Sequence, residues 1–173
     1  MGLSGVRGIG RGGLNRQPIL VGEFVEARPL RADDFDELYQ AAADPLLWEQ
    51  HPEPNRWRRE VFRAYFEDHL ASGGALAIVD RATGALIGVT RYDNLDAGQS
   101  EVEIGWTFLA RPYWGGAYNA DLKRVMLEHA FQAVDTVVFL VGEENLRSRR
   151  AVEKLGAVER GRRRGQLLYE LRR

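Results

Sequence analysis

The sequence predicts one domain that mixes helices and strands, in the α/β or α+β class. Segments with the two-residue periodicity of strands and segments with the 3.6-residue periodicity of helices follow one another along the chain. The length of 173 residues suits a single domain with a sizeable core, and no internal repeat divides it. The predicted order of elements is β-α-α-β-β-β-α-β-α-β-β.

The first residues differ in composition from the rest. Residues 1–18 are rich in Gly and Arg and poor in apolar side chains, which predicts a flexible tail before a single domain at 19–173. Gly8, Gly10 and Gly13 formally match the G-x-G-x-x-G pattern of dinucleotide sites. No strand precedes them and no amphipathic helix follows, so we interpret the match as a coincidence.

The first half of the domain is predicted to contain a strand, two helices and a hairpin. The predicted elements are a strand at 23–30, helices at about 33–42 and 58–70, and strands at 75–80 and 85–92. Asp34 and Glu37 would open the first helix as a capping box. Three prolines predict that most of residues 44–55 form a loop.

The second half contains the clearest strand pattern. In residues 101–109 the side chains alternate, so that one face would carry Val102, Ile104, Trp106 and Phe108, and the other Glu101, Glu103, Gly105 and Thr107. The remaining predicted elements are a helix at 117–134, a buried strand at 136–141, a helix at 146–155, and strands at 158–162 and 167–171.

The composition excludes several kinds of chemistry. The chain contains no cysteine, which rules out disulfides, thiolate metal sites and a cysteine acyl-enzyme. The three histidines lack the spacing of a metal site, so we expect no metal. A net charge of -1 does not favour nucleic acid or an anionic membrane. No apolar run is long enough to cross a bilayer, and we expect a cytoplasmic protein.

A glycine pair joins the 101–109 strand to the helix that follows. The segment consists of Trp114, Gly115, Gly116, Ala117, Tyr118 and Asn119. Glycine lets a backbone approach a ligand closely, and free N–H groups at a helix N-terminus attract phosphate. Asn119 would cap the helix. An ordinary strand-to-helix turn explains this segment about as well as a phosphate site does.

A second segment changes this balance. Residues 145–157, NLRSRRAVEKLGA, follow the buried strand and open a helix. With the glycine pair and the upstream Glu103-Ile104-Gly105-Trp106, the chain resembles the GNAT superfamily of N-acetyltransferases, and within it the branch of the ribosomal-protein N-terminal acetyltransferases. The resemblance implies a mixed, mostly antiparallel central sheet with helices on both faces, whose fourth and fifth strands splay apart.

The resemblance implies acetyl-CoA as the co-substrate. In the family the loop at 114–119 wraps the pyrophosphate of coenzyme A, although Ala117 and Asn119 depart from the usual small residues, and Gly116 would then absorb the turn. The backbone of Thr107, Phe108 and Leu109 would pair with the pantetheine arm. Asn145 and Ser148 would reach that arm near its thiol, while a helix cap and an exposed polar residue are the alternatives.

Acetyl transfer to an amine requires a proton acceptor, because an amine must be neutral to attack. Glu103 is the candidate general base, since the family often has an acid at this place. Glu101 shares its face and is the second choice and a candidate substrate contact. Solvated strand carboxylates are an equally good interpretation of both.

The leaving thiolate needs a proton donor, for which many members of the family use a Tyr in the last helix. Val152 occupies that place and is interpreted as core. Ser148 is the remaining local hydroxyl and the candidate general acid, and Tyr118 is a more distant one. His51 lies in the loop where the family lines its acceptor site, so it is a candidate substrate contact, with a structural role as the alternative.

The sequence therefore predicts an N-acetyltransferase that moves an acetyl group from acetyl-CoA to a primary amine, on a protein N-terminus or a small molecule. A non-catalytic acyl-CoA-binding or sensor module is the alternative. Arg160 and residues 162–164 form a basic run that could attract an acidic acceptor or RNA, but no aromatic residues interleave it, and nucleic acid is not expected. No membrane partner is expected, and a homodimer is compatible with the sequence.

Overall fold

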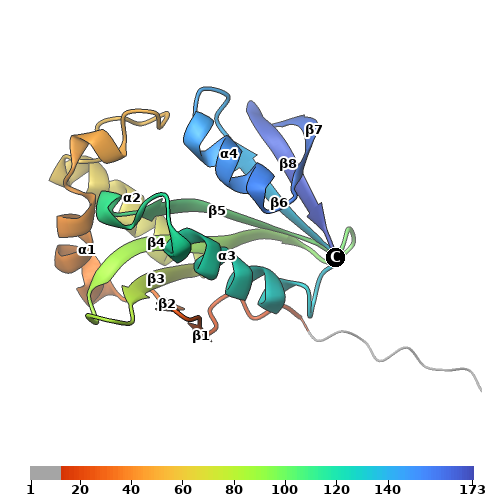
Figure 1. Cartoon of the computed structure of the whole chain (residues 1–173), viewed down its shortest axis with the longest axis horizontal. Helices are drawn as coiled ribbons and strands as arrows, with labels where there is room; N and C mark the ends of the chain where they lie inside the picture. The colour runs from red at the N-terminus through yellow and green to blue at the C-terminus, as the bar shows by residue number, and fades with distance from the viewer. Residues whose placement is uncertain (1–12) are drawn as a thin grey trace, which may run out of the picture.

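The computed structural model describes residues 13–173 (Figure 1). The helices are α1 (Phe35–Ala42), α2 (Arg59–Ser72), α3 (Ala117–Ala130) and α4 (Leu146–Lys154), with short 3₁₀ helices at Ala32–Asp34, Pro45–Leu47 and Arg111–Tyr113. The strands are β1 (Leu20–Val21), β2 (Val25–Pro29), β3 (Ala75–Asp80), β4 (Leu86–Asp96), β5 (Glu101–Leu109), β6 (Thr136–Val141), β7 (Val158–Arg163) and β8 (Gln166–Arg172).

All eight strands belong to one sheet in the order β1-β2-β3-β4-β5-β6-β8-β7. Every neighbouring pair is antiparallel except β5 and β6, which run parallel. The parallel pair is the one joined through a helix, α3, because parallel neighbours need a long crossover. The prediction of a mixed, mostly antiparallel sheet is confirmed.

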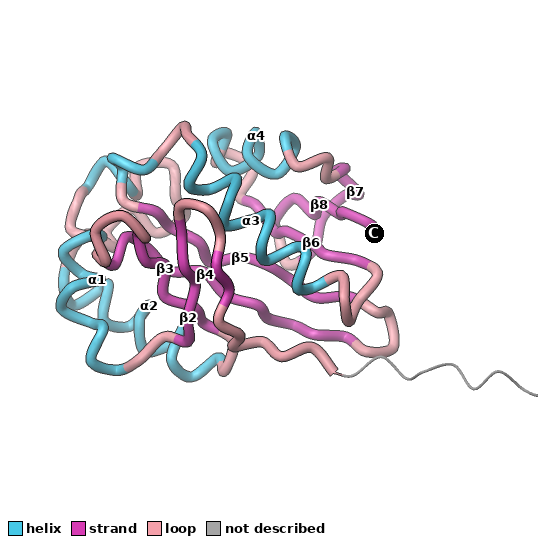
Figure 2. Tube along the Cα trace, turned by 60° about the horizontal axis from the view of Figure 1, so that its bottom comes forward, coloured by secondary structure: helices cyan, strands magenta, loops and turns pink. Residues whose placement is uncertain are grey.

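Helices cover both faces of this sheet (Figure 2). On one face, α1 and α2 bury aromatic and aliphatic side chains spaced three or four residues apart, such as Phe35, Leu38, Phe62 and Phe66. On the other face α3 buries Leu122, Met126 and Ala130, and α4 adds Val152 to the same cluster. Val152 is therefore core, as predicted.

Several boundaries and one cap differ from the prediction. Helix α3 ends at Ala130, where residues 131–133 turn, and β4 continues beyond the predicted end at residue 92 to Asp96. The predicted capping box is wrong. The Asp34 carboxylate accepts from the backbone N–H of Arg31 and from Arg28, and Glu37 accepts from the Leu86 N–H. The partner of Glu37 lies 49 residues away along the chain, which local spacing does not report.

The predicted tail falls mainly on residues 1–12, which lie outside the described residues, as do Gly8 and Gly10 of the dinucleotide pattern. The end of the predicted tail contacts the domain. Gln17 Nε2 donates to the Ala75 carbonyl at 3.2 Å, and the Asn15 carbonyl lies 2.7 Å from His129 Nε2. Within residues 13–173 no helix is long and apolar enough to cross a membrane.

Candidate active site

The two parallel strands separate after a short stretch of pairing. β5 pairs with β6 only at Glu101, Val102 and Glu103, while its pairing with β4 continues to Leu109. Figure 1 shows the two strands diverging toward their carboxyl ends. The edge of β5 that faces β6 is thus free of a neighbouring strand from residue 104 onward. The fourth and fifth predicted strands, at 101–109 and 136–141, are β5 and β6, and the prediction that they splay apart is confirmed.

A β-bulge at Trp106 divides β5. Trp106 has a left-handed φ of 51°, and the register with β4 shifts between Val89 and Arg91. An extra residue reverses the side-chain alternation beyond it. Val102 and Ile104 consequently belong to the α3 side of the core, whereas Phe108 belongs to the α1/α2 side. The prediction that all four share one face is wrong, because strict alternation assumes a strand without a bulge.

Where β5 has no neighbour on the β6 side, side chains hydrogen-bond to the bulge and to the end of the strand. The Tyr65 hydroxyl of α2 donates to the Trp106 carbonyl at 2.6 Å, and Trp114 Nε1 donates to the Leu109 carbonyl at 2.8 Å. The backbone beside the split is therefore rigidly held without being covered by a strand.

The loop after β5 has the backbone that a phosphate site requires. Gly115 carries the left-handed φ of 70°, and a Cβ there would meet nothing within 4 Å. Gly116 is the N-cap of α3 and no side chain caps the helix, so the first N–H groups have no side-chain acceptor. The expectations for Gly116 and Asn119 are corrected: Gly115 makes the turn, and Asn119 lies inside the helix. Ala117 is helical and fits.

The other side of the split is formed by the start of α4. Asn145 Oδ1 accepts from the Ser148 N–H at 3.2 Å, so Asn145 is the helix cap that we considered as an alternative. The Ser148 hydroxyl has no hydrogen bond among the described residues. A Cβ on Gly142 would lie 3.6 Å from Pro52 Cγ and 4.0 Å from Asn145 Cβ. The loop between α1 and α2 thus reaches the carboxyl end of β6.

Glu103 lies where the two strands part, and its carboxylate is almost fully buried, with 4% of the side chain exposed. Asn94 Nδ2 donates to Oε2 at 2.7 Å, and the Arg164 guanidinium from the β7–β8 turn pairs with the same oxygen. Oε1 makes no hydrogen bond within the described chain. The carboxylate is therefore held through one oxygen and keeps the other as a free acceptor.

Backbone strain is concentrated around this carboxylate. Asn94 and Arg164, its two partners, both have a left-handed φ, of 46° and 50°. Such conformations cost of order 1–3 kcal/mol for a residue with a side chain, and they persist where surrounding structure enforces them. Arg164 and Gly165 form the two-residue turn between β7 and β8, where Asn-Gly is the usual pair. The turn thus carries an arginine that reaches Glu103.

The basic run at the β7–β8 hairpin is neutralised by carboxylates. Arg163 pairs with Glu101 at 2.5 Å and Arg162 with Glu143 at 2.7 Å, in addition to the Arg164–Glu103 pair. Hence Glu101 and Glu103 are not simply solvated strand carboxylates. The pairing also removes most of the positive field that attraction of RNA would require.

His51 lies in the loop between α1 and α2, against the Trp48 ring at 5.5 Å between centroids. Its Nδ1 accepts from the Glu53 N–H, and the Arg56 guanidinium is 3.0 Å from Nε2. Burial, and secondarily the Arg56 charge, lower the pKa of His51 to about 4. A neutral imidazole engaged in this way organises the loop, and Arg56 in turn stacks on Tyr65 at 4.3 Å, above the bulge.

Tyr118 points away from the split. Its hydroxyl is 3.2 Å from Asp80 Oδ1 on β3, and its ring stacks edge-on with Tyr113 at 4.8 Å. Burial and the neighbouring carboxylate raise the pKa of this tyrosine. The side chain of Tyr118 therefore faces β3, and only its backbone belongs to the 114–119 loop.

Sequence reasoning missed a buried amine beneath the split. Lys123 of α3 is 6% exposed, and its Nζ donates to Thr107 Oγ1 at 3.1 Å. The two hydroxyls of Thr107 and Thr90 are 2.8 Å apart, and the Phe139 ring of β6 lies 6.0 Å from Nζ. Burial lowers the pKa of Lys123 to about 8. The only sequence signal was its position among the apolar residues of the helix.

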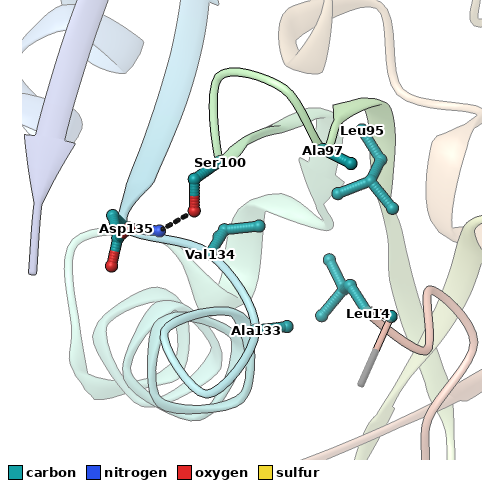
Figure 3. A pocket seen from close by; sticks show the side chains of 8 residues that line it. Leu14, Leu95, Ala97, Ser100, Ala133, Val134 and Asp135 are labelled. Carbon is teal, nitrogen blue, oxygen red and sulfur yellow. Dashed lines mark hydrogen bonds between the residues drawn. The ribbon is translucent and has the colours of Figure 1, made fainter. Parts of the chain in front are cut away.

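A hollow of about 300 Å³ lies at the opposite end of β5 (Figure 3). Leu14, Leu95, Ala97 and Val134 line it, and the Ser100 hydroxyl accepts from the Asp135 N–H at 3.0 Å. Asp135 is the one titratable side chain among its described lining residues. The part of β5 where the strands separate, with buried Glu103 at the last paired position and the free edge beyond it, is the better candidate for an active site.

Comparison with known proteins agrees with this geometry. Residues 25–158 match the family model described as the acetyltransferase (GNAT) domain. The chain belongs to the GNAT acetyltransferase family. The matched range includes β5, the 114–119 loop and the start of α4. The protein is thus an acetyltransferase, and its family uses acetyl-CoA as the acyl donor.

Solved structures of GNAT proteins share the fold. A GCN5-related N-acetyltransferase from Brucella melitensis superposes with a TM-score of 0.75 at 20% identity, over 90% of this chain and 79% of that one. A candidate ribosomal-protein-serine acetyltransferase from Vibrio cholerae gives 0.72 at 14%, over 92% and 100%. Mycobacterium smegmatis RimJ, in complex with CoA-disulfide, gives 0.63 at 20%, over 86% and 81%. A search of curated proteins finds no match.

The family match confirms the predicted resemblance to the GNAT superfamily, and the neighbours share its fold. In residues 13–173 no group of three or more His, Cys, Asp or Glu side chains could hold a metal ion.

Proposed function

We propose that this GNAT protein transfers an acetyl group from acetyl-CoA directly to a primary amine, on a protein N-terminus or a small molecule. The observation that carries the proposal is the meeting of two features on one strand. A free β5 edge suited to the pantetheine arm adjoins the buried carboxylate of Glu103, which keeps one oxygen unengaged.

The residues on each side of the split fit coenzyme A. The uncapped N–H groups that follow Gly115 and Gly116 suit the pyrophosphate. The backbone of Thr107, Phe108 and Leu109 suits the amide-bearing arm. Bound acetyl-CoA would supply an activated thioester to this site. Asn145 has its oxygen engaged in the helix cap, so its amide nitrogen is the group left to contact the arm.

Glu103 would act as general base. The amine nitrogen attacks the thioester carbonyl, the new N–C bond forms as the C–S bond breaks, and the amine proton passes to Glu103 directly or through water. Because Asn94 and Arg164 donate to Oε2, Oε1 is the oxygen that would accept this proton. An N–H on the free β5 edge would stabilise the oxyanion.

Ser148 would protonate the departing thiolate of coenzyme A. Its hydroxyl is unengaged, while the hydroxyl of Tyr118 is held by Asp80 and Val152 is buried. A thiolate is a tolerable leaving group, so a weak acid suffices.

The acceptor would enter over the face that α1 and α2 cover. His51 and Arg56 shape the loop on that side, and Glu101 with its Arg163 partner stands beside Glu103. A neutral His51 contacts an acceptor through hydrogen bonding or packing and carries no charge at neutral pH.

Acetyl transfer is tested with acetyl-CoA, a panel of amines and a thiol reagent that detects released coenzyme A. The panel includes peptides with free N-termini, amino acids and polyamines. With an accepted amine, Glu103→Gln should lower kcat by about 10²–10⁴-fold, the usual contribution of a general base. Glu60→Gln, at an exposed α2 residue without a described partner, should match the wild type.

Equal kcat for Glu103→Gln and the wild type would reject Glu103 as the base. Coenzyme A binding measured by calorimetry without turnover on any amine would instead favour the non-catalytic binding module.

A further inference from the structure

A cation and an aromatic ring meet across the mouth of the β5/β6 split. The Arg147 guanidinium carbon lies 3.6 Å from the centroid of the Trp114 ring, a close cation–π contact. Trp114 follows the end of β5, and Arg147 follows the end of β6. The contact therefore joins the two segments that diverge at the candidate coenzyme site.

Both partners are held in position by their own elements. The Trp114 indole donates to the Leu109 carbonyl, and its ring packs against both clusters of the core. Arg147 is the second residue of α4, a helix capped by Asn145. The guanidinium is thus a fixed feature of the mouth rather than one position of a freely moving side chain.

Arg147 differs from the neighbouring arginines in its lack of an acidic partner. Arg149 donates to Tyr169 and Arg162 pairs with Glu143, whereas no carboxylate in residues 13–173 lies within ion-pair distance of Arg147. The residue is half-buried. Burial lowers the pKa of Arg147, and the more distant Glu49 opposes this only in part. A partly desolvated cation without a counter-ion is suited to an anionic ligand.

The stacking geometry leaves the donors available. A guanidinium lying over an indole uses its face for the contact, while its N–H groups point outward in the plane of the fork. That fork matches two oxygens of a phosphate group. The Trp114 ring therefore orients the N–H donors of Arg147 and leaves them free to bind a ligand.

We propose that Arg147, held by Trp114, binds a phosphate group of coenzyme A from the α4 side of the split. The inference rests on the proposed function. It adds a contact from the opposite side to the backbone loop at 114–119, so that coenzyme A is held between the two strand ends. Arg147 would thus make the site selective for phosphate-bearing coenzyme over the bare pantetheine arm.

Isothermal titration calorimetry on the full-length chain tests this without relying on turnover. The ligands are coenzyme A, 3′-dephospho-coenzyme A and pantetheine, and the variants are Arg147→Gln, Arg147→Lys and Arg150→Gln. Arg150 lies on the same helix, is exposed and has no described partner, so its variant removes the same charge elsewhere. Circular dichroism and thermal unfolding establish that each variant is folded.

Arg147→Gln should weaken coenzyme A binding about 10- to 100-fold, the range for a charged hydrogen bond. Arg150→Gln should stay within about 2-fold of the wild type, because an exposed charge contributes little. Lysine should restore part of the loss. If Arg147→Gln binds 3′-dephospho-coenzyme A as tightly as the wild type does, Arg147 contacts the 3′-phosphate. If Arg147→Gln binds 3′-dephospho-coenzyme A more weakly than the wild type but binds pantetheine equally well, Arg147 contacts the pyrophosphate.

Two results would overturn the inference alone: equal coenzyme A affinities for Arg147→Gln and Arg150→Gln, or an equal loss with pantetheine, which has no phosphate. A wild-type protein that does not bind coenzyme A would reject the proposed function as well.

Discussion

Along β5, the segment Glu101 to Glu103 has a neighbouring strand on each side, whereas the segment Trp106 to Leu109 has one on the β4 side only. In the first segment the carboxylates are held by side chains from other elements, such as Asn94 and Arg164. In the second, the backbone carbonyls themselves are held, by Tyr65 and Trp114.

This difference shows how one strand can serve two purposes. Strand pairing on both sides makes the first segment a rigid support for a buried acid. Side-chain donors replace the missing neighbour in the second segment at single points, so most of its β6-facing edge stays free for another hydrogen-bonding chain. The bulge at Trp106 marks the change from one to the other.

The largest expected effect on stability comes from Lys123, the buried amine below the second segment of β5. The pKa of Lys123 is lowered from 10.5 to about 8 by burial. The unfolded chain therefore binds more protons between these values, and the wild type should gain stability relative to Lys123→Met as pH rises from about 8 to 10.5. The full change is about 3 kcal/mol in the free energy of unfolding.

Urea unfolding of both proteins at pH 7.5, 9 and 10.5 measures this change. Lys154→Met, at the exposed and only other lysine of the chain, is the control. A stability difference for Lys123→Met that is constant with pH would mean that Thr107 and Thr90 keep the amine charged.

In the turn after the second segment of β5, substitution of Gly115 should reduce stability more than substitution of Gly116. Gly115→Ala places a Cβ on a left-handed backbone and should cost about 1–2 kcal/mol of stability, with weaker coenzyme A binding. Gly116→Ala adds a Cβ to an extended backbone, with only the Trp114 carbonyl 4.0 Å away, and should cost less.

Chemical denaturation and calorimetry compare the two glycine variants. The reverse order of effects would show that Gly116 makes the turn, as the sequence alone suggested.

The smallest effect concerns the bulge. Tyr65→Phe removes the hydrogen bond to the Trp106 carbonyl and should cost about 1 kcal/mol of stability. Tyr39→Phe removes a similar bond to the Trp57 carbonyl, which lies in the loop between α1 and α2 and not on β5, and should cost about as much.

Only Tyr65→Phe should also lower the rate of acetyl transfer, because only that bond holds the strand beside the split. Steady-state kinetics on the two variants, normalised to folded protein, provide the measurement. Equal rates would show that the bulge keeps its shape without the tyrosine.

Sequence patterns were sufficient wherever a signal is local. The alternation over residues 136–141, the apolar faces of α1 and α2, and the glycine pair before α3 each predict their element from neighbours a few residues away. The family and the splayed strands followed from these patterns and from the resemblance they supported, as did the order of elements apart from the short strand β1, which was not predicted. The roles of Ser148, His51 and Glu101 stay predictions.

Contacts between distant segments were decided by the tertiary structure. Arg164 and Glu103 are 61 residues apart and Tyr65 and Trp106 are 41 apart, and each pair meets only because the fold packs the elements that carry them together. A bulge changes which face a side chain occupies without leaving a mark in the alternation, so Phe108 was misplaced. Composition and periodicity thus determined what the chain builds, while the pairing of strands and ion pairs determined which groups remain free to react.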